Sequence, residues 1–171
     1  NIMKADRARS EYEGALHLMK YPAPDWTPPV LTCSSLTRAG IDEIWETITD
    51  YHARMSENGW LEKKRREQAL TWLAEALTDL GAHAARHGVP LLYEPLNRYE
   101  TNLLNRQLDA AQFLESRQVG NVKLLCDLFH MNIEEADLAA SIRAAGKHVG
   151  HVHYADSNRR AMGLGHTDPK P

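Results

Sequence analysis

Three residues that could bind a metal ion or move a proton each stand at or near the end of an apolar run. Glu94, Asp127 and His153 are separated along the chain by 33 and 26 residues, and each separation is about the length of one strand-helix unit. In a parallel sheet the carboxyl ends of neighbouring strands meet at one edge. We therefore expect the three side chains to share one site.

Two carboxylates and an imidazole make a mixed oxygen and nitrogen ligand set without a thiolate. This set suits Mn, Mg, Co or Fe better than structural zinc, although zinc also accepts these ligands. A single glutamate at a strand end is more often a cap or an ion-pair partner than a ligand. Three such residues on successive strands are a stronger signal, so we interpret Glu94, Asp127 and His153 as a candidate metal site.

Two further histidines lie close to these strand ends. His130 follows Asp127 by three residues and could hydrogen-bond a substrate oxygen or a ligand carboxylate, or be a histidine of a loop or helix start. His151 shares a strand face with His153, because side chains two residues apart point the same way. It could be a core histidine or a partner of a ligand. The acidic residues 134–135 are expected in the first turn of a helix, where the helix dipole favours them.

Loop residues after the strands could bind a substrate. Arg98, Arg159 and Arg160 could hold an anionic or polyhydroxyl substrate, or be solvated loop arginines. The glycine-containing run 163–167 is expected to be a flexible turn, and its glycine spacing is too loose to indicate a phosphate cradle.

The elements that must position these groups follow from apolar spacing. Spacing of three and four residues predicts helices at 5–20, 41–55, 62–87, 106–117 and 136–145. Short apolar runs predict strands at 30–33, 89–93, 122–126 and 149–154. The last three strands are almost purely apolar, which is typical of parallel strands buried on both faces. The alternation predicts an α/β fold with a parallel sheet covered by helices.

The composition is that of an ordinary globular protein. The 171 residues fit one domain, with 43% hydrophobic and 25% charged residues. A net charge of -3 gives no indication of a nucleic-acid or anionic-membrane partner. The two cysteines, Cys33 and Cys126, have no zinc-site or redox spacing, so we expect reduced thiols and a cytoplasmic location. No apolar run reaches the roughly 20 residues of a membrane helix.

Three motifs in combination resemble one enzyme family. They are Glu94-Pro-Leu-Asn-Arg-Tyr-Glu100, Cys126-Asp-Leu-Phe-His-Met-Asn-Ile-Glu-Glu135, and His151-Val-His153 followed by Ala155-Asp-Ser-Asn-Arg159. These motifs and their spacings closely resemble those of the ketose 3-epimerases, the D-tagatose and D-psicose 3-epimerase group of the xylose-isomerase-like TIM-barrel superfamily. The resemblance extends from about residue 60 to residue 168.

The resemblance implies a (β/α)8 TIM barrel and an isomerase that acts on sugars. Residues 1–171 would form a single partial barrel domain with about strands 4 to 7, truncated at both ends, because a complete barrel needs roughly 250 residues. The implied reaction is metal-dependent epimerisation of a ketose at C3 through an enediolate, with proton transfer by carboxylates. The implied partners are a small sugar and other copies of the chain in a homodimer or homotetramer, with no nucleic acid and no membrane.

The resemblance also implies roles for individual residues. Glu94, Asp127 and His153 would ligate a divalent metal, usually Mn or Co, with Mg or Zn as other options. Glu94 would also be one of two carboxylates that exchange the proton at C3.

Three more residues, Glu100, His130 and Arg159, would hold substrate hydroxyls. The second catalytic glutamate, which is also the fourth metal ligand, belongs to the eighth strand of the family, and we place that strand after the end of this chain. We therefore expect the 171 residues alone to be inactive.

Other functions remain as alternatives. Hydroxypyruvate isomerases and inosose dehydratases share the positions of the Glu, Asp and His ligands, but Asn97-Arg98 and His130-Met-Asn-Ile133 favour the ketose epimerases. Type IV apurinic endonucleases share the barrel, yet they need more ligands at strand ends and a basic face for DNA. A non-catalytic barrel fragment that acts as a binding module is the last alternative.

Overall fold

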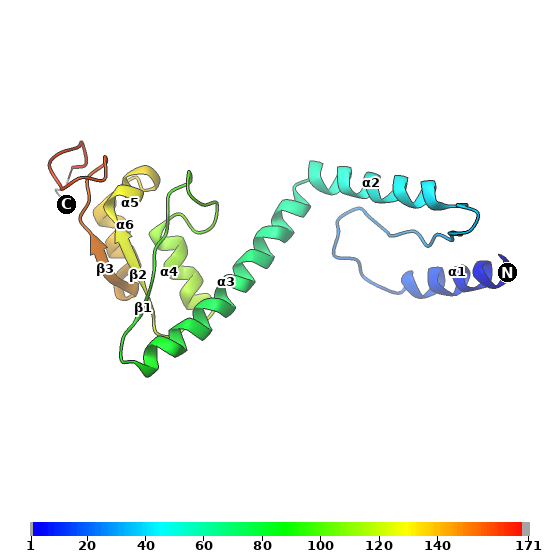
Figure 1. Cartoon of the computed structure of the whole chain (residues 1–171), viewed down its shortest axis with the longest axis horizontal. Helices are drawn as coiled ribbons and strands as arrows, with labels where there is room; N and C mark the ends of the chain where they lie inside the picture. Colours follow the sequence, from blue (N-terminus) through cyan, green and yellow to red (C-terminus); the bar gives the residue numbers. More distant parts are fainter. Residues whose placement is uncertain (1, 169–171) are drawn as a thin grey trace. The chain divides into compact units, whose positions relative to one another are not determined.

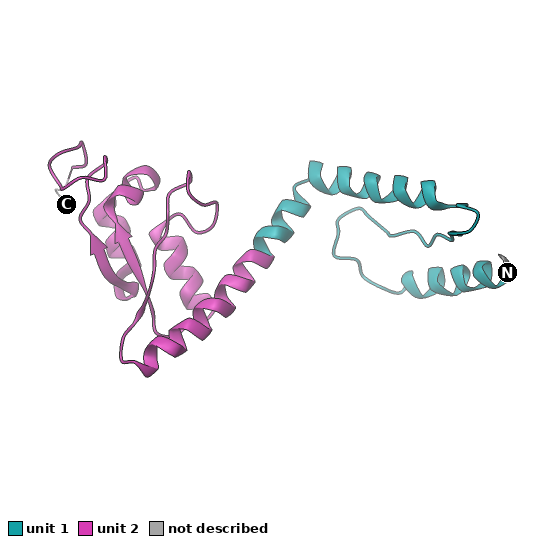
Figure 2. Ribbon diagram, in the orientation of Figure 1, with its two compact units in different colours: residues 1–67 teal, residues 68–171 magenta. Residues whose placement is uncertain are grey.

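The computed structural model describes residues 2–168, and the chain divides into two compact units (Figure 2). Unit 1 is Asn1–Glu67 and unit 2 is Gln68–Pro171. The single partial domain expected from the sequence stays a prediction.

Unit 1 is helical. It contains α1 (Ile2–Leu16), α2 (Ile41–Glu57) and the first turns of α3 (Trp60–Arg86). Gly40 precedes α2 with φ of 76°, a left-handed conformation that glycine adopts without a steric cost. The strand predicted at 30–33 is wrong: within residues 2–168 this segment has no regular secondary structure and belongs to no sheet. Pro28 and Pro29 just before it lack the backbone N–H groups that a sheet requires.

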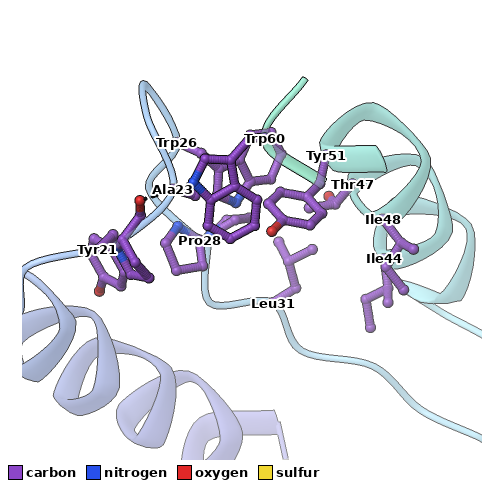
Figure 3. Close-up of a pocket in the computed structure, with 12 residues that line it drawn as sticks. Tyr21, Ala23, Trp26, Pro28, Leu31, Ile44, Thr47, Ile48, Tyr51 and Trp60 are labelled. Atoms are coloured by element: carbon purple, nitrogen blue, oxygen red, sulfur yellow. Dashed lines mark hydrogen bonds between the residues drawn. The ribbon is translucent and has the colours of Figure 1, made fainter. Parts of the chain in front are cut away.

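The segment between α1 and α2 folds over an apolar cavity of about 570 Å³ (Figure 3). Aromatic side chains from the loop and from both following helices line it. The rings of Trp26 and Tyr51 meet edge to face with centroids 5.1 Å apart, and Trp60 Nε1–H donates to the carbonyl of Pro22 at 3.2 Å. None of the lining residues is acidic, basic or a histidine, so this cavity offers no group for the chemistry expected from the sequence.

Unit 2 is built on a three-stranded parallel sheet (Figure 1). The strands, in spatial order, are β1 (Leu91–Tyr93), β2 (Val122–Asp127) and β3 (Val149–His153). The connections contain α4 (Gln107–Ser116), α5 (Leu128–Glu134), α6 (Leu138–Ala145) and the 3-10 turn η1 (Gly146–His148). The later three of the four predicted strands, and the parallel sheet covered by helices, are confirmed.

The core of unit 2 surrounds β2. The helix α4 packs against β2 and α6, and Leu124, Leu114 and Ala110 are at most 1% exposed. The expectation of burial on both faces is therefore confirmed for β2. It is wrong for β3, where Val149 packs against the core but residues 150–153 are exposed, Val152 by 39%.

The helix α5 was not predicted, because its seven residues are too short to show clear periodicity. Asp127 begins it: the carboxylate oxygen Oδ1 accepts the backbone N–H of Phe129 at 2.8 Å. Aspartate is one of the preferred residues at this position, since its side chain satisfies a backbone donor that has no partner within the helix. One residue therefore ends β2 and caps α5.

Residues 2–168 contain no helix that is both long enough and apolar enough to cross a membrane.

Candidate functional site

The predicted site residues meet at the carboxyl edge of the sheet. Asp127 and His153 are direct partners in the register of β2 and β3, and Glu94 follows the last residue of β1. Ligand atoms of Glu94, Asp127 and His130 all lie within 4.8 Å of one another. His153 adjoins this group, because its Nδ1 is 3.3 Å from Asp127 Oδ2. The structure thus brings together four side chains from three strands and one helix.

Exposure differs among these four side chains. The side chain of His130 is 4% exposed, that of Asp127 14%, that of Glu94 31% and that of His153 48%. The group is therefore closed on the side of α5 and open on the side of β3. A ligand can reach Glu94, Asp127 and His153 from the open side.

The Asp127 carboxylate divides its two oxygens between structure and site. Oδ1 holds the start of α5, while Oδ2 faces His153. The hydrogen bond from the Phe129 N–H to Oδ1 fixes the orientation of the Asp127 carboxylate. Oδ2 therefore points toward His153 and the open side of the site.

His130 lies on α5. One ring nitrogen faces Glu94, and the other faces Glu100 and Asn97. Nε2 is 3.7 Å from Glu94 Oε1, and Nδ1 is 3.8 Å from Glu100 Oε1. The backbone N–H and the side-chain amide of Asn97 approach Nδ1 at 3.2 and 2.8 Å. Asn97 is 2% exposed. From the sequence it was known only as part of a family motif, and no role in the site was predicted for it. Its spacing of three from both Glu94 and Glu100 was the signal that could have indicated a role.

Glu100 and Arg159 form an ion pair at the rim of the site. The guanidinium of Arg159 also lies 4.3 Å above the ring of Phe129, a favourable cation-π arrangement. Both charged side chains remain partly exposed. The pair can offer a polar ligand both a hydrogen-bond acceptor and a donor.

Arg98 is not free to bind a substrate in this structure. Glu134 Oε1 accepts its backbone N–H at 2.6 Å, and its guanidinium donates to both carboxylate oxygens at 3.0 Å. The Arg98 guanidinium lowers the pKa of Glu134 through this hydrogen bond. Glu134 is the last residue of α5, so the expected helix-start position of residues 134–135 is wrong.

Glu135 follows α5 and joins three helices. Its side chain is 1% exposed. Oε1 accepts the first backbone N–H of α4, that of Gln107, at 2.8 Å, and Oε2 accepts the hydroxyl of Ser141 on α6 at 2.9 Å. This contact holds α5, and with it His130, against the rest of unit 2.

The loop after β3 has turns and bends at residues 162–166, as the sequence indicated, and its backbone is held by a buried carboxylate. The carboxylate of Asp156, which is 0% exposed, accepts four backbone N–H groups at 2.7–3.0 Å. The donors are the backbone N–H groups of Ser157, Gly163, Gly165 and Thr167.

Hydrogen bonds from the backbone, that of Thr167 foremost, lower the pKa of Asp156. The Asp156 carboxylate thus engages four backbone N–H groups of the loop. The loop it shapes carries Arg159.

The remaining histidine of β3 is exposed. His151 lies with its ring centroid 5.2 Å from that of His153, and residues 150–153 are exposed in the described chain. The interpretation of His151 as a core histidine is therefore wrong for this chain.

Comparison with known proteins gives a family match and two kinds of relatives. The model of the xylose isomerase-like TIM barrel family matches residues 40–170. An L-ribulose 3-epimerase of Methylomonas sp. strain DH-1 is 41% identical over 93 residues, which are 54% of this chain and 32% of that protein. The crystal structure of D-psicose 3-epimerase with D-tagatose from Clostridium cellulolyticum H10 superimposes with a TM-score of 0.52 at 36% identity, covering 54% of this chain and 32% of that one.

The second kind of relative is a GTPase. The GTPase ArgK of Escherichia coli K12 is 44% identical over 66 residues, which are 39% of this chain and 20% of that protein. The chain thus spans about a third of the length of the epimerases that it matches and a fifth of this GTPase.

Proposed function

Because the chain belongs to the xylose isomerase-like TIM barrel family, we propose that it is part of a metal-dependent ketose 3-epimerase. One observation carries the proposal: Glu94, Asp127, His130 and His153 meet at the carboxyl ends of three neighbouring parallel strands. Relatives named as L-ribulose and D-psicose 3-epimerases support the reaction class.

The donor set fits a divalent metal. We propose Glu94, Asp127 and His153 as the residues that would hold it, because two carboxylates and an imidazole suit Mn or Co, with Mg and Zn as other options. The proximity of Glu94 to Asp127, and of Asp127 to His153, supports this choice. When bound, the metal would polarise the carbonyl oxygen of the sugar and make the proton on the neighbouring carbon more acidic.

Side chains of this protein would remove the proton and hold the sugar. Glu94 would remove the proton from C3 as a general base, leaving an enediolate. His130, Glu100 and Arg159 would hold the sugar hydroxyls so that C3 faces Glu94. Return of the proton to the opposite face requires a second carboxylate, and we propose that it lies outside these 171 residues. We accordingly expect this chain to bind metal but not to turn over a ketose by itself.

Metal binding is the first test. Mn²⁺ titrated into the metal-stripped chain and followed by electron paramagnetic resonance should bind, and Glu94→Gln should weaken binding strongly. Glu75→Gln, an exposed glutamate on α3, is the matched control and should bind like the unchanged chain. Equal binding by both variants would remove Glu94 from the metal site.

Turnover is the second test. A panel of free ketohexoses and ketopentoses should be supplied, with Mn²⁺ or Co²⁺, to the chain and to a longer protein that carries it. Interconversion at C3 by the longer protein alone would support the proposal. Metal binding without turnover by either would favour the hydroxypyruvate isomerase-like or inosose dehydratase-like alternatives.

We also propose a cytoplasmic homodimer or homotetramer, as in the family resemblance. Light scattering coupled to gel filtration measures the mass directly, and a monomer at assay concentration would refute the oligomer.

The likeness to a GTPase does not lead us to propose GTP hydrolysis. The 171 residues contain no G-x-x-x-x-G-K-[ST] run, whose backbone N–H groups and lysine hold nucleotide phosphates. We infer instead that unit 1, Asn1–Glu67, is the GTPase-like segment, because the 66 matched residues are close to its length while the 93 residues of the epimerase match fit within unit 2. Residues 1–67 and residues 68–171 should be compared with known proteins separately. We expect GTPases among the relatives of residues 1–67 and epimerases among those of residues 68–171. Epimerases among the relatives of residues 1–67 would contradict this inference.

A further inference from the structure

We propose that Asn97 is a positioning residue that sets the tautomer of His130, so that Nε2 carries the proton and points toward Glu94. Both residues are buried, with Asn97 2% and His130 3% exposed as whole residues. Their placement toward a sugar rests on the proposed function, whereas the tautomer itself follows from the hydrogen bonds alone.

The orientation of the Asn97 amide is determined by its own loop. The backbone N–H of Tyr99 can only donate, and it lies 2.9 Å from Asn97 Oδ1. At the other end of the amide, Nδ2 lies 3.1 Å from Glu100 Oε1, which as a carboxylate oxygen accepts. A flipped amide would place an N–H against the N–H of Tyr99 and an oxygen against the carboxylate of Glu100. Both neighbours therefore require Oδ1 toward Tyr99 and Nδ2 toward Glu100.

That orientation determines what His130 can do at Nδ1. Asn97 Nδ2 approaches Nδ1 at 2.8 Å, and the backbone N–H of Asn97 approaches it at 3.2 Å. Both groups are donors, so Nδ1 must be the acceptor and carries no proton. In a neutral imidazole the other nitrogen then carries it. Nε2–H is directed to the side where Glu94 Oε1 lies 3.7 Å away.

The tautomer assigns different roles to the two histidines of the site, His130 and His153. A ring nitrogen that carries a proton has no lone pair for a metal ion, so His130 acts as a hydrogen-bond donor although it lies within 4.8 Å of Glu94 and Asp127. His130 would give its Nε2–H to a sugar oxygen or to Glu94. The imidazole ligand is then left to His153, whose Nδ1 faces the carboxylate oxygen Oδ2 of Asp127 at 3.3 Å instead of a pair of donors.

The test is the tautomer itself, read in the metal-free 171-residue chain. Long-range ¹H–¹⁵N correlation spectra separate the protonated from the unprotonated nitrogen of each histidine ring. The signals of His130 are those lost in His130→Gln. We expect an unprotonated Nδ1 and a protonated Nε2. The reverse pattern, or a doubly protonated ring at neutral pH, would overturn the proposal.

Variants separate the role of Asn97 from the general fold of the loop. Asn97→Asp replaces the Nδ2 donor by an acceptor, so the proton should move to Nδ1 or be added there. Asn97→Ala removes the side-chain donor without adding a charge and should reduce the share of the Nε2–H tautomer; it also serves if Asn97→Asp does not fold. Asn105→Asp is the control, because Asn105 donates to the carbonyls of Leu96 and Thr101 in the same loop and not to His130.

The outcomes distinguish this inference from the epimerase proposal. An unchanged tautomer in both Asn97 variants, or the same change in Asn105→Asp, would refute the role of Asn97. Failure of Mn²⁺ binding would refute the metal site and leave the tautomer result standing, since no metal is present in these spectra.

Discussion

Replacement of Glu135 should destabilise unit 2 more than replacement of any exposed glutamate on the same helices. The carboxylate is nearly inaccessible and holds the first N–H of α4 through Gln107 and the hydroxyl of Ser141 on α6. Glu135→Ala leaves the buried N–H of Gln107 without an acceptor and leaves the space of the side chain unfilled. Arg106 adds little to the contact, because its side chain is 53% exposed.

The magnitude follows from the two bonds that are lost. A buried donor left without a partner costs about 1–3 kcal/mol, and hydrogen bonds to charged groups contribute about 1.5–3 kcal/mol each. Allowing for partial rescue by water, we expect Glu135→Ala to lower the free energy of unfolding of unit 2 by roughly 2–4 kcal/mol. Glu135→Gln keeps the shape and one acceptor oxygen, so about 1–2 kcal/mol is expected. Both are large fractions of the roughly 5–15 kcal/mol by which domains are stable.

The assay must report on unit 2. Trp26, Trp45 and Trp60 belong to unit 1, and Trp72 of unit 2 is 64% exposed, so tryptophan fluorescence would not report on the core of unit 2. Hydrogen exchange of the β2 amides does, since exchange of such core amides requires unfolding. A loss of 2–4 kcal/mol corresponds to exchange roughly 30- to 700-fold faster, because each 1.4 kcal/mol is a factor of about ten.

Glu115→Gln is the matched control. Glu115 lies on α4 and pairs with Lys147, but both side chains are more than half exposed, and exposed pairs contribute little. Exchange in this control should be unchanged. If Glu135→Ala exchanged no faster than Glu115→Gln, the view of Glu135 as the joint between three helices would be wrong.

Further predictions concern the core, the pH, the loop after β3 and unit 1. Leu124→Ala removes a side chain that is 0% exposed at the centre of the sheet and should cost about 2–5 kcal/mol in the same exchange experiment; a loss below 1 kcal/mol would argue against the packing around β2. Glu134 and Asp156 both have a lowered pKa in the folded chain. Their contribution to stability is therefore fully present above their ordinary pKa values near 4 and is lost as the pH falls through the lower folded values. Denaturant unfolding from neutral pH down to about pH 2 should show this loss, and stability that rises on acidification would have the wrong sign. Asp156→Asn places an N–H where the carboxylate accepted backbone N–H groups, so the amide signals of 156–167 should shift while those of β2 stay; unchanged loop signals would refute the anchoring role. Trp60→Ala opens the apolar cavity of unit 1 and should leave Mn²⁺ binding unchanged, since every proposed ligand belongs to unit 2; weaker binding would connect the cavity to the metal site.

Local signals in the sequence determined the main elements and the candidate ligands. The apolar runs before Glu94 and Asp127 and around His153 form three strands whose spacing matches strand-helix units, and each run is long enough to be recognised without knowledge of its neighbours. Because parallel strands end at one edge, placing these residues on adjacent strands was enough to predict that they meet. The family motifs added the roles of Glu100 and Arg159, which remain proposals.

Only the tertiary structure decided which groups are partners. The contact between Asn97 and His130 joins residues 33 positions apart, and nothing in either local sequence selects that pairing. The same holds for Glu135, which meets Gln107 from 28 residues away, and for Asp156, whose four donors lie up to 11 residues further along the chain. Periodicity is a property of neighbouring residues and can be read from them. Hydrogen-bond partners, tautomers and exposure depend on which distant segments the fold brings within about 3 Å, and the sequence does not state that distance.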